Sequence, residues 1–245
     1  DHCLVGSEMC IRDRNKGGAY EEAAVLYRSN AQSRAIEEAL LRVSIPYRIY
    51  GGLRFYERLE IKNAISYLRI IFNNNDNPSF ERSISNPTRG VGEKTLAKIR
   101  NAAKQYNISY IKASAKLIDE GKISGRGGSG LKDYLEFIAG CKGFIEENSL
   151  SDLMELIIKE TGLYAYHAKE AGEKGKTRTE NLEELITATK NFEQSIKDER
   201  TNIEIAESYL DIISLDSGDR QASEHDDAAQ LMTCLLYTSD AADEP

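Results

Sequence analysis

The spacing of apolar residues along this chain changes once, at the polar stretch NNNDNP, residues 73–78. Ahead of that stretch, short apolar runs alternate with segments of helical spacing, which predicts strand, helix, strand and helix in turn. The predicted strands lie at 23–27 and 46–52, and the predicted helices at 31–43 and 57–73. Because strands that alternate with helices usually pair in parallel, this part of the chain is predicted to be α/β.

Beyond residue 78, the apolar residues follow only helical periods up to about residue 216. The glycine-rich stretch 121–130 is predicted to be a loop, and a last strand is predicted at 227–233. The predicted fold class is therefore mixed: a partial α/β domain with a parallel sheet, interrupted by a large all-α insertion domain. The predicted helices of the insertion are 79–85, 93–105, 109–119, 130–147, 150–161, 178–195 and 202–214.

The composition excludes several classes of protein. No run of 18 apolar residues is present, so no transmembrane helix is predicted. The three histidines are scattered, and the chain has no Gly-x-x-x-x-Gly-Lys-Ser/Thr loop for the phosphates of ATP, so we assign no catalytic, cofactor-binding or metal-binding residue. The cysteines fit neither a zinc site nor a disulfide framework, which predicts a reduced, cytoplasmic protein; they are Cys3, Cys10, Cys141 and Cys234.

Charge is unevenly distributed along this acidic chain, whose formal net charge is −8. Window 82–104 contains six basic residues and one acidic residue, whereas 205–245 contains ten acidic residues and one arginine. A local basic segment on an acidic protein is the pattern expected where phosphate is bound at one place. The alternative is a solvated helix face on which basic residues cluster by chance.

The segment TRGVGEKT places a glycine–valine–glycine turn directly before a predicted helix. Glycines let a ligand approach the backbone closely, and the amides of the turn and of the helix N-terminus suit a phosphate. We therefore predict a contact to duplex DNA that does not read base sequence. The alternative is a plain connection between helices. The predicted contacts are Thr88, Arg89, Gly90, Val91, Gly92, Lys94 and Thr95.

Two earlier segments carry side chains suited to phosphate, sugar and base contacts at the predicted carboxyl ends of strands. The alternatives are ordinary helix capping for the first segment and core packing of the aromatic residues for the second. From LYRSNAQSR the candidates are Arg28, Ser29, Asn30, Ser33 and Arg34. From YGGLRFYER they are Gly51, Gly52, Phe55 and Arg58. A further basic segment, GEKGKTR at 172–178, is predicted to be a solvated loop. It precedes a capping box of Thr177 and Glu180, and a second box is predicted at Ser149 and Asp152.

Taken in order, four stretches of this chain resemble superfamily 1 DNA helicases of the UvrD/PcrA/Rep family. They are AVLYRSNAQSRAIEEALL, PYRIYGGLRFYERLEIKNAISYLR, NPTRGVGEKTL and GEKGKTRTENLEELITAT. The resemblance implies a 3′–5′ helicase that uses ATP and Mg²⁺ to unwind DNA in repair or replication. It further implies contacts to duplex and single-stranded DNA, and repair proteins among the partners.

The resemblance also implies a domain layout. Residues 15–75 would be part of a RecA-like domain 2A, 76–225 its helical insertion 2B, and 226–233 the return strand of 2A. The ends, 1–14 and 234–245, resemble translated sequencing-adapter reads and are excluded from fold reasoning. The family's ATP-binding loop lies upstream of the stretches matched here, so we expect this stretch alone not to hydrolyse ATP.

Two alternatives stay open from the sequence. One is a subunit of a helicase–nuclease of the same superfamily, which requires a nuclease domain further downstream. The other is a non-enzymatic helical protein-interaction module, with the acidic stretch 205–227 as its partner surface.

Overall fold

The computed structural model describes residues 19–50, 52–196, 199–218 and 227–234. These residues divide into two compact units. One contains the described residues up to Arg58 together with those from Ser214 onward, and we call it the sheet unit. The other, Leu59–Ile213, we call the helical unit. The adapter-like end 1–14, the adapter-like end 234–245 apart from Cys234, Gly51, and residues 219–226 of the acidic stretch 205–227 lie outside the described residues.

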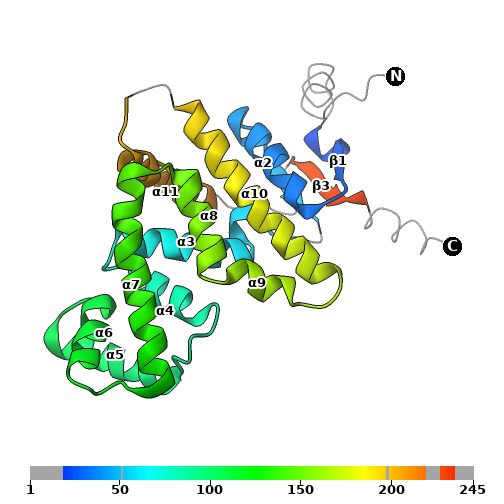
Figure 1. Cartoon of the computed structure of the whole chain (residues 1–245). Helices are drawn as coiled ribbons and strands as arrows, with labels where there is room; N and C mark the ends of the chain where they lie inside the picture. Colours follow the sequence, from blue (N-terminus) through cyan, green and yellow to red (C-terminus); the bar gives the residue numbers. More distant parts are fainter. Residues whose placement is uncertain (1–18, 51, 197–198, 219–226, 235–245) are drawn as a thin grey trace. The chain divides into compact units, whose positions relative to one another are not determined.

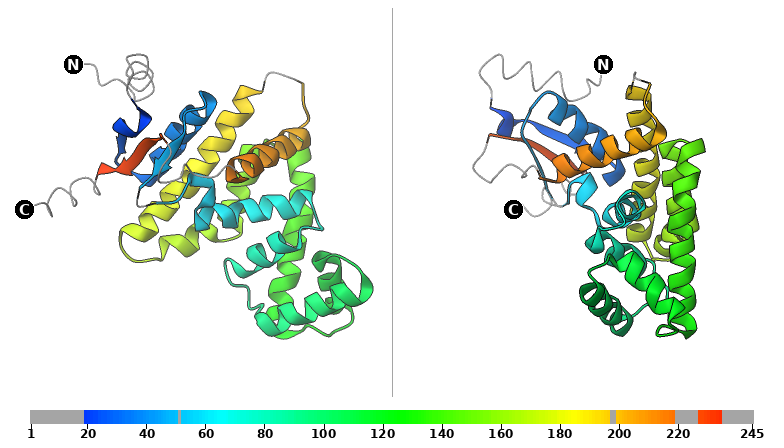
Figure 2. Two further views of the ribbon diagram at one scale, coloured as in Figure 1. Left: turned by 180° about the vertical axis from the view of Figure 1, so that it is seen from behind. Right: turned by 90° about the vertical axis from the view of Figure 1, so that its left-hand side faces the viewer.

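The sheet unit contains three parallel strands in the order β1-β3-β2. Strand β1 is Ala24–Tyr27, β2 is Tyr47–Ile49 and β3 is Ala229–Thr233 (Figures 1 and 2). Val25 and Ile49 both lie in register with Leu231, so the strand from the far end of the sequence pairs with both of the others. The prediction that the chain returns to a parallel sheet after the helices is confirmed.

Helix α2, Ser33–Arg42, connects β1 to β2 and packs its apolar side on the sheet. The core of this unit is small because the sheet is small. Its buried members are Tyr27, Leu40, Ile45, Tyr47, Ile49, Ala229 and Leu231. Short 3₁₀ helices precede β1 and α2 and follow β2; they are η1 (Tyr20–Glu22), η2 (Asn30–Gln32) and η3 (Phe55–Glu57).

The helical unit contains only helices among its described residues. They are α3 (Leu59–Phe72), α4 (Asn77–Ser85), α5 (Glu93–Tyr106), α6 (Tyr110–Asp119), α7 (Gly125–Glu147), α8 (Leu150–Glu160), α9 (Leu163–Ala168), α10 (Glu173–Ser195) and most of α11 (Asn202–Gly218). Helix α3 is central, because α4, α7, α8 and α10 all pack against it. Its buried side chains include Ile61, Tyr67 and Leu68, each with no exposed surface.

Helix α7 extends along the helical unit, with α6 packed against it and α5 beside α6 (Figures 1 and 2). The predicted loop at 121–130 is wrong from Gly125 onward, because the glycines there form the first turns of α7. Glycine normally weakens a helix, but here it permits contact with backbone. A Cβ on Gly130 would stand 2.1 Å from the carbonyl oxygen of Arg89.

Helix α10 also begins earlier than predicted, at Glu173, so the predicted loop at 172–178 is wrong apart from Gly172. Gly172 caps the helix with φ of 75°, and a Cβ on Gly175 would stand 2.3 Å from the carbonyl oxygen of Glu170. Thr177 therefore lies inside the helix, and its predicted capping box is wrong. The box of Ser149 with Asp152 is confirmed at the start of α8.

The division between the units lies at Arg58, whereas the sequence placed a domain boundary at residue 75. The difference is α3, which packs with the helices that follow it. Short helix α9 had no sequence prediction. None of the described helices is both long enough and apolar enough to cross a membrane.

Candidate nucleic-acid interface

The predicted phosphate site lies between α4 and α5, and we call residues Thr88–Thr95 the Gly90 turn. Helix α4 is capped by Asp76, whose carboxylate accepts a hydrogen bond from the amide of Ser79. Gly90 has φ of 74°, a backbone conformation that L side chains rarely adopt. Helix α5 then begins after Gly92, which offers no side chain to cap it.

Several backbone amides of this turn make no hydrogen bond to a described residue. The amides of Thr95 and Leu96 bond to the carbonyl oxygen of Gly92. Within the part of the chain that the structure describes, no protein acceptor engages the amides of the three residues 90–92, nor those of the first two residues of α5. Thr88, Gly90, Gly92 and Lys94 are exposed, and Val91 and Thr95 are half-buried. The turn therefore presents unused N–H donors at the positive end of a helix.

The Arg89 side chain does not share this exposure. Its guanidinium is half-buried, and it donates to the carbonyl oxygens of Ser83 at 3.2 Å, Pro87 at 2.9 Å and Thr161 at 3.1 Å. Ser83 belongs to the last turn of α4, and Thr161 is the C-cap of α8. Both are negative helix ends, so the charge of Arg89 is used inside the protein. The sequence placed Arg89 among the predicted phosphate contacts, whereas in the structure its guanidinium donates to these three carbonyl oxygens.

Two tyrosine rings also contact the Arg89 guanidinium. The guanidinium carbon lies 5.4 Å from the ring centre of Tyr67 and 5.7 Å from that of Tyr134. Burial raises the pKa of both phenols, so each stays protonated. The Tyr67 hydroxyl donates toward the carbonyl oxygens of Ser83 at 2.5 Å and Asn86 at 2.8 Å. Buried side chains thus hold the start of the turn in place, while the amides of residues 90–92 bond no described residue.

Helix α7 supports the turn at close range. A Cβ on Gly127 would stand 2.8 Å from the carbonyl oxygen of Gly90 and 4.0 Å from the Thr95 hydroxyl oxygen. Real Cβ atoms essentially never approach an atom that closely, so only glycine fits at this position. The glycines of the segment GRGGSG therefore let two parts of the chain far apart in sequence pack backbone to backbone.

The basic window 82–104 carries less free charge than its sequence suggests. Arg100 bonds Glu81 through two nitrogens at 2.6 Å each, and Glu93 at 2.5 Å. These hydrogen bonds hold the pKa of Glu81 below its ordinary value. Arg100 also neutralises Glu93, the acidic residue nearest the exposed amides. Lys94 makes no ion pair with any described residue, so its charge is available to a ligand.

One cation beside the turn was not among the sequence candidates. Arg126, in the first turn of α7, is exposed, and a Cβ on Gly90 would stand 3.1 Å from its Cγ atom. It was missed because residues 121–130 were predicted to be a loop of no defined position.

In the sheet unit, the structure brings several candidates together but buries them. Glu37, 3% exposed, accepts hydrogen bonds from the Ser33 hydroxyl at 2.6 Å and the Phe55 amide at 3.2 Å. The Arg58 guanidinium donates to the Ser33 hydroxyl and to the carbonyl oxygen of Asn30, both at 2.6 Å. Phe55 lies under that guanidinium. These contacts hold the βα junction together, as the capping and core alternatives anticipated.

Of the remaining sheet-unit candidates, Arg34 is buried and the others are half-buried or exposed where the structure describes them. Arg34 pairs with Glu38 at 2.7 Å. Arg28 and Gly52 are exposed, and Ser29 and Asn30 are half-buried. The amides of Arg28 and Ser29 both donate to the Gln32 side chain, which organises the turn into α2. Gly51 lies outside the described residues.

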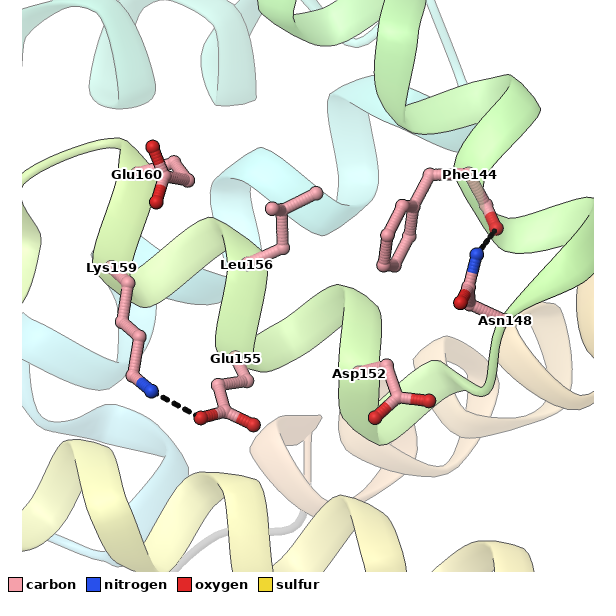
Figure 3. A pocket seen from close by; sticks show the side chains of 7 residues that line it. All are labelled: Phe144, Asn148, Asp152, Glu155, Leu156, Lys159 and Glu160. Carbon is pink, nitrogen blue, oxygen red and sulfur yellow. Dashed lines mark hydrogen bonds and ion pairs between the residues drawn. The ribbon is translucent and has the colours of Figure 1, made fainter.

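A shallow hollow of about 370 Å³ lies between the C-terminal end of α7 and helix α8 (Figure 3). Its apolar members are Phe144 and Leu156, and around them stand Asp152, Glu155, Lys159, Glu160 and Asn148. Lys159 pairs with Glu155, which leaves the hollow with net negative charge. Negative charge repels phosphate, so this hollow does not extend the candidate interface.

Comparisons with known proteins show what the chain is similar to. Residues 7–123 are similar to the UvrD-like helicase C-terminal domain. Over 220 residues it is homologous to DNA helicase II of Escherichia coli (strain K12), with 44% identity over 90% of this chain. It is also 35% identical over 214 residues, 86% of this chain, to ATP-dependent DNA helicase PcrA of Bacillus subtilis (strain 168). The chain spans about 30% of the length of these relatives.

Proposed function

We propose that the helical unit binds the sugar–phosphate backbone of duplex DNA at the Gly90 turn, as part of an ATP-dependent DNA helicase. The observation that carries this proposal is the run of amides at residues 90–92 that bond no described residue, beside the cation of Lys94, which has no ion-pair partner among the described residues. Backbone amides and lysine bind phosphate oxygens without reading bases, which suits an enzyme that acts on any sequence. The names of the relatives, DNA helicase II and PcrA, support the same function.

The proposed contacts at the turn are Thr88, Gly90, Val91, Gly92, Lys94 and Thr95. Arg89 is assigned to positioning the turn, because its donors are directed to Ser83, Pro87 and Thr161. In the sheet unit we propose that Arg28, Ser29, Asn30, Gly51 and Gly52 contact single-stranded DNA. Ser33, Arg34, Phe55 and Arg58 support those residues from the interior.

We further propose that the sheet unit is part of a RecA-like domain 2A and that most of the helical unit is its insertion 2B. The parallel order β1-β3-β2 supports this, since the helical unit enters between β2 and β3 in the sequence. Unwinding with 3′–5′ polarity, a role in repair or replication, repair proteins as partners and a cytoplasmic location are proposed for the longer protein. The relatives are named DNA helicase II and ATP-dependent DNA helicase PcrA, and these finer assignments follow the resemblance of the sequence to that family.

ATP hydrolysis with Mg²⁺ is likewise proposed for the longer protein, because the PcrA relatives are named as ATP-dependent. The described residues contain no group of three or more His, Cys, Asp or Glu side chains that could hold a metal ion. The sequence also lacks a Gly-x-x-x-x-Gly-Lys-Ser/Thr loop. We therefore place no contact to ATP or Mg²⁺ on these residues.

Duplex binding by the full chain tests the proposed function. Fluorescence anisotropy with two blunt duplexes of unrelated sequence, over a range of salt concentrations, measures affinity and its salt dependence. We expect Lys94→Ala to raise Kd roughly threefold to tenfold for both duplexes and to reduce the salt slope by about 1. Lys142→Ala controls for the change in net charge, because Lys142 is exposed on α7 and makes no ion pair with the residues that the structure describes.

Three outcomes would count against the proposal. The wild-type chain would fail to bind duplex at low salt, or Lys94→Ala and Lys142→Ala would weaken binding equally, or the effect would differ between the two sequences. Capture of a protein partner without any DNA binding would favour the interaction-module alternative.

A further inference from the structure

The N-terminal turn of α7 packs against the Gly90 turn. A Cβ on Gly90 would stand 3.1 Å from Arg126 Cγ and 3.4 Å from the Arg126 carbonyl oxygen, so the aliphatic stem of Arg126 lies directly on Gly90. The next residue, Gly127, lies beside the Gly90 carbonyl oxygen and the Thr95 hydroxyl. Arg126 is therefore fixed at its base next to residues of the proposed DNA contact, although it is 36 positions away in the sequence.

The charge of Arg126 is unused within the described part of the chain. The neighbouring arginines differ: Arg89 bonds three carbonyl oxygens, and Arg100 bonds Glu81 and Glu93. No ion pair among the described residues engages Arg126, and its side chain is exposed. The first turn of α7 also contains no acidic residue that would compete for it.

We propose that Arg126 is a DNA-backbone contact of this site, so that α7 supplies a side-chain cation beside the amides supplied by the Gly90 turn. The inference rests on the proposed function and adds a residue from another helix to it. A guanidinium can bond two phosphate oxygens at once, whereas the ammonium of Lys94 acts as a point charge. Arg126 and Lys94 approach the turn from different helices, α7 and α5, so together they set its orientation on the duplex backbone.

The experiment compares six versions of this chain: wild type, Arg126→Gln, Arg126→Lys, Lys94→Ala, the Arg126→Gln/Lys94→Ala double variant and the control Lys142→Ala. Glutamine keeps the stem that packs on Gly90 and removes only the charge and the guanidinium. We expect Arg126→Gln to raise Kd roughly threefold to tenfold on duplexes of unrelated sequence and to reduce the salt slope by about 1. Thermal unfolding should be unchanged, and Arg126→Lys should restore the salt slope while restoring affinity only in part.

Lys142→Ala is the matched control, because Lys142 is exposed on the same helix 16 residues further on, which is about 24 Å along the axis. If Arg126→Gln binds like wild type while Lys94→Ala is weakened, the assignment of Arg126 fails and the proposed function stands. If the wild-type chain binds no duplex, the proposed function fails. If Arg126→Gln lowers the unfolding temperature together with affinity, or weakens binding no more than Lys142→Ala, Arg126 is not a phosphate contact.

Discussion

Some arginines of this chain bond acceptors inside the protein, whereas others keep a charge that a ligand could bind. The groups around each arginine decide which of the two applies. Arg89 and Arg126 flank the same glycine turn, yet the first is drawn inward by the C-terminal ends of α4 and α8. The aliphatic part of the Arg126 side chain instead packs against the backbone of Gly90. A charged side chain binds the strongest acceptors within reach, and exposed helix C-terminal carbonyls are strong acceptors for arginine.

Replacing Arg89 should therefore act on stability. We expect Arg89→Ala to lower the free energy of unfolding by about 2–4 kcal/mol, since it removes the donors that bond the carbonyl oxygens of Pro87 and Thr161. Arg89→Lys should recover little, because an ammonium lacks the planar fork that reaches both helix ends. Urea unfolding of the full chain measures both changes.

Lys94→Ala is the comparison for Arg89, because Lys94 is exposed and unpaired among the described residues. Its free energy of unfolding should stay within about 0.5 kcal/mol of wild type. If Arg89→Ala were as stable as wild type but bound duplex poorly, Arg89 would be a direct phosphate contact after all.

Among the elements, α7 shows how glycine in a helix can serve packing. The segment GRGGSG has low helix propensity, yet it forms the first turns of α7 against the Gly90 turn. Gly127 and Gly130 face carbonyl oxygens of that turn, whereas a Cβ on Gly140 or Gly143, further along the helix, would meet no described atom within 4 Å. The same residue type therefore has opposite energetic consequences within one element.

We expect Gly130→Ala to lower the free energy of unfolding by about 1–3 kcal/mol, because its Cβ would overlap the Arg89 carbonyl oxygen. It should also weaken duplex binding, since the turn must move to relieve the overlap. Gly140→Ala should instead raise the free energy of unfolding by about 0.5–1 kcal/mol. Chemical denaturation of the two variants checks the opposite signs, and a stabilised Gly130→Ala would contradict the close packing.

For the molecule as a whole, polar contacts between distant helices bind the helical unit together. Glu170 accepts from Arg178 at 2.6 Å and shares a hydrogen bond with the buried His167 at 2.7 Å. Arg178 lies 3.6 Å from Glu60, which accepts from Asn181 at 2.6 Å. This network joins α3, the residues after α9, and α10.

Because of this network, the free energy of unfolding should depend on pH. The hydrogen bond with His167, and then the contacts with Arg178, hold the pKa of Glu170 below its ordinary value of 4.5. A carboxylate with a lowered folded-state pKa stabilises the protein fully above its unfolded pKa, and that contribution disappears as pH falls through the folded value. The advantage of wild type over Glu170→Gln in urea unfolding should thus be largest at neutral pH and shrink below about pH 4.5. A gap that does not change with pH would show that Glu170 contributes by packing alone.

Periodicity and local chemistry were enough to predict the parallel strands, most helices, the box at Ser149 and the return to the sheet. Those features depend on residues close together in sequence, where spacing directly reports which face is buried. The direction of a polar side chain follows different rules. Arg89 reaches Thr161, 72 positions away, and Arg100 reaches Glu81, 19 positions away.

The position of Arg126 beside Gly90, and the burial of Ser33, Phe55 and Arg58, have the same origin. They arise when helices from separate parts of the chain pack and bring donors and acceptors together that no local window contains. The sequence thus indicated which turn presents its backbone, because glycine spacing is a local property. Tertiary packing decided which basic side chains beside that turn have no ion-pair partner among the described residues. A basic side chain that lies next to an acceptor of the protein bonds that acceptor, so its charge is not available to a ligand.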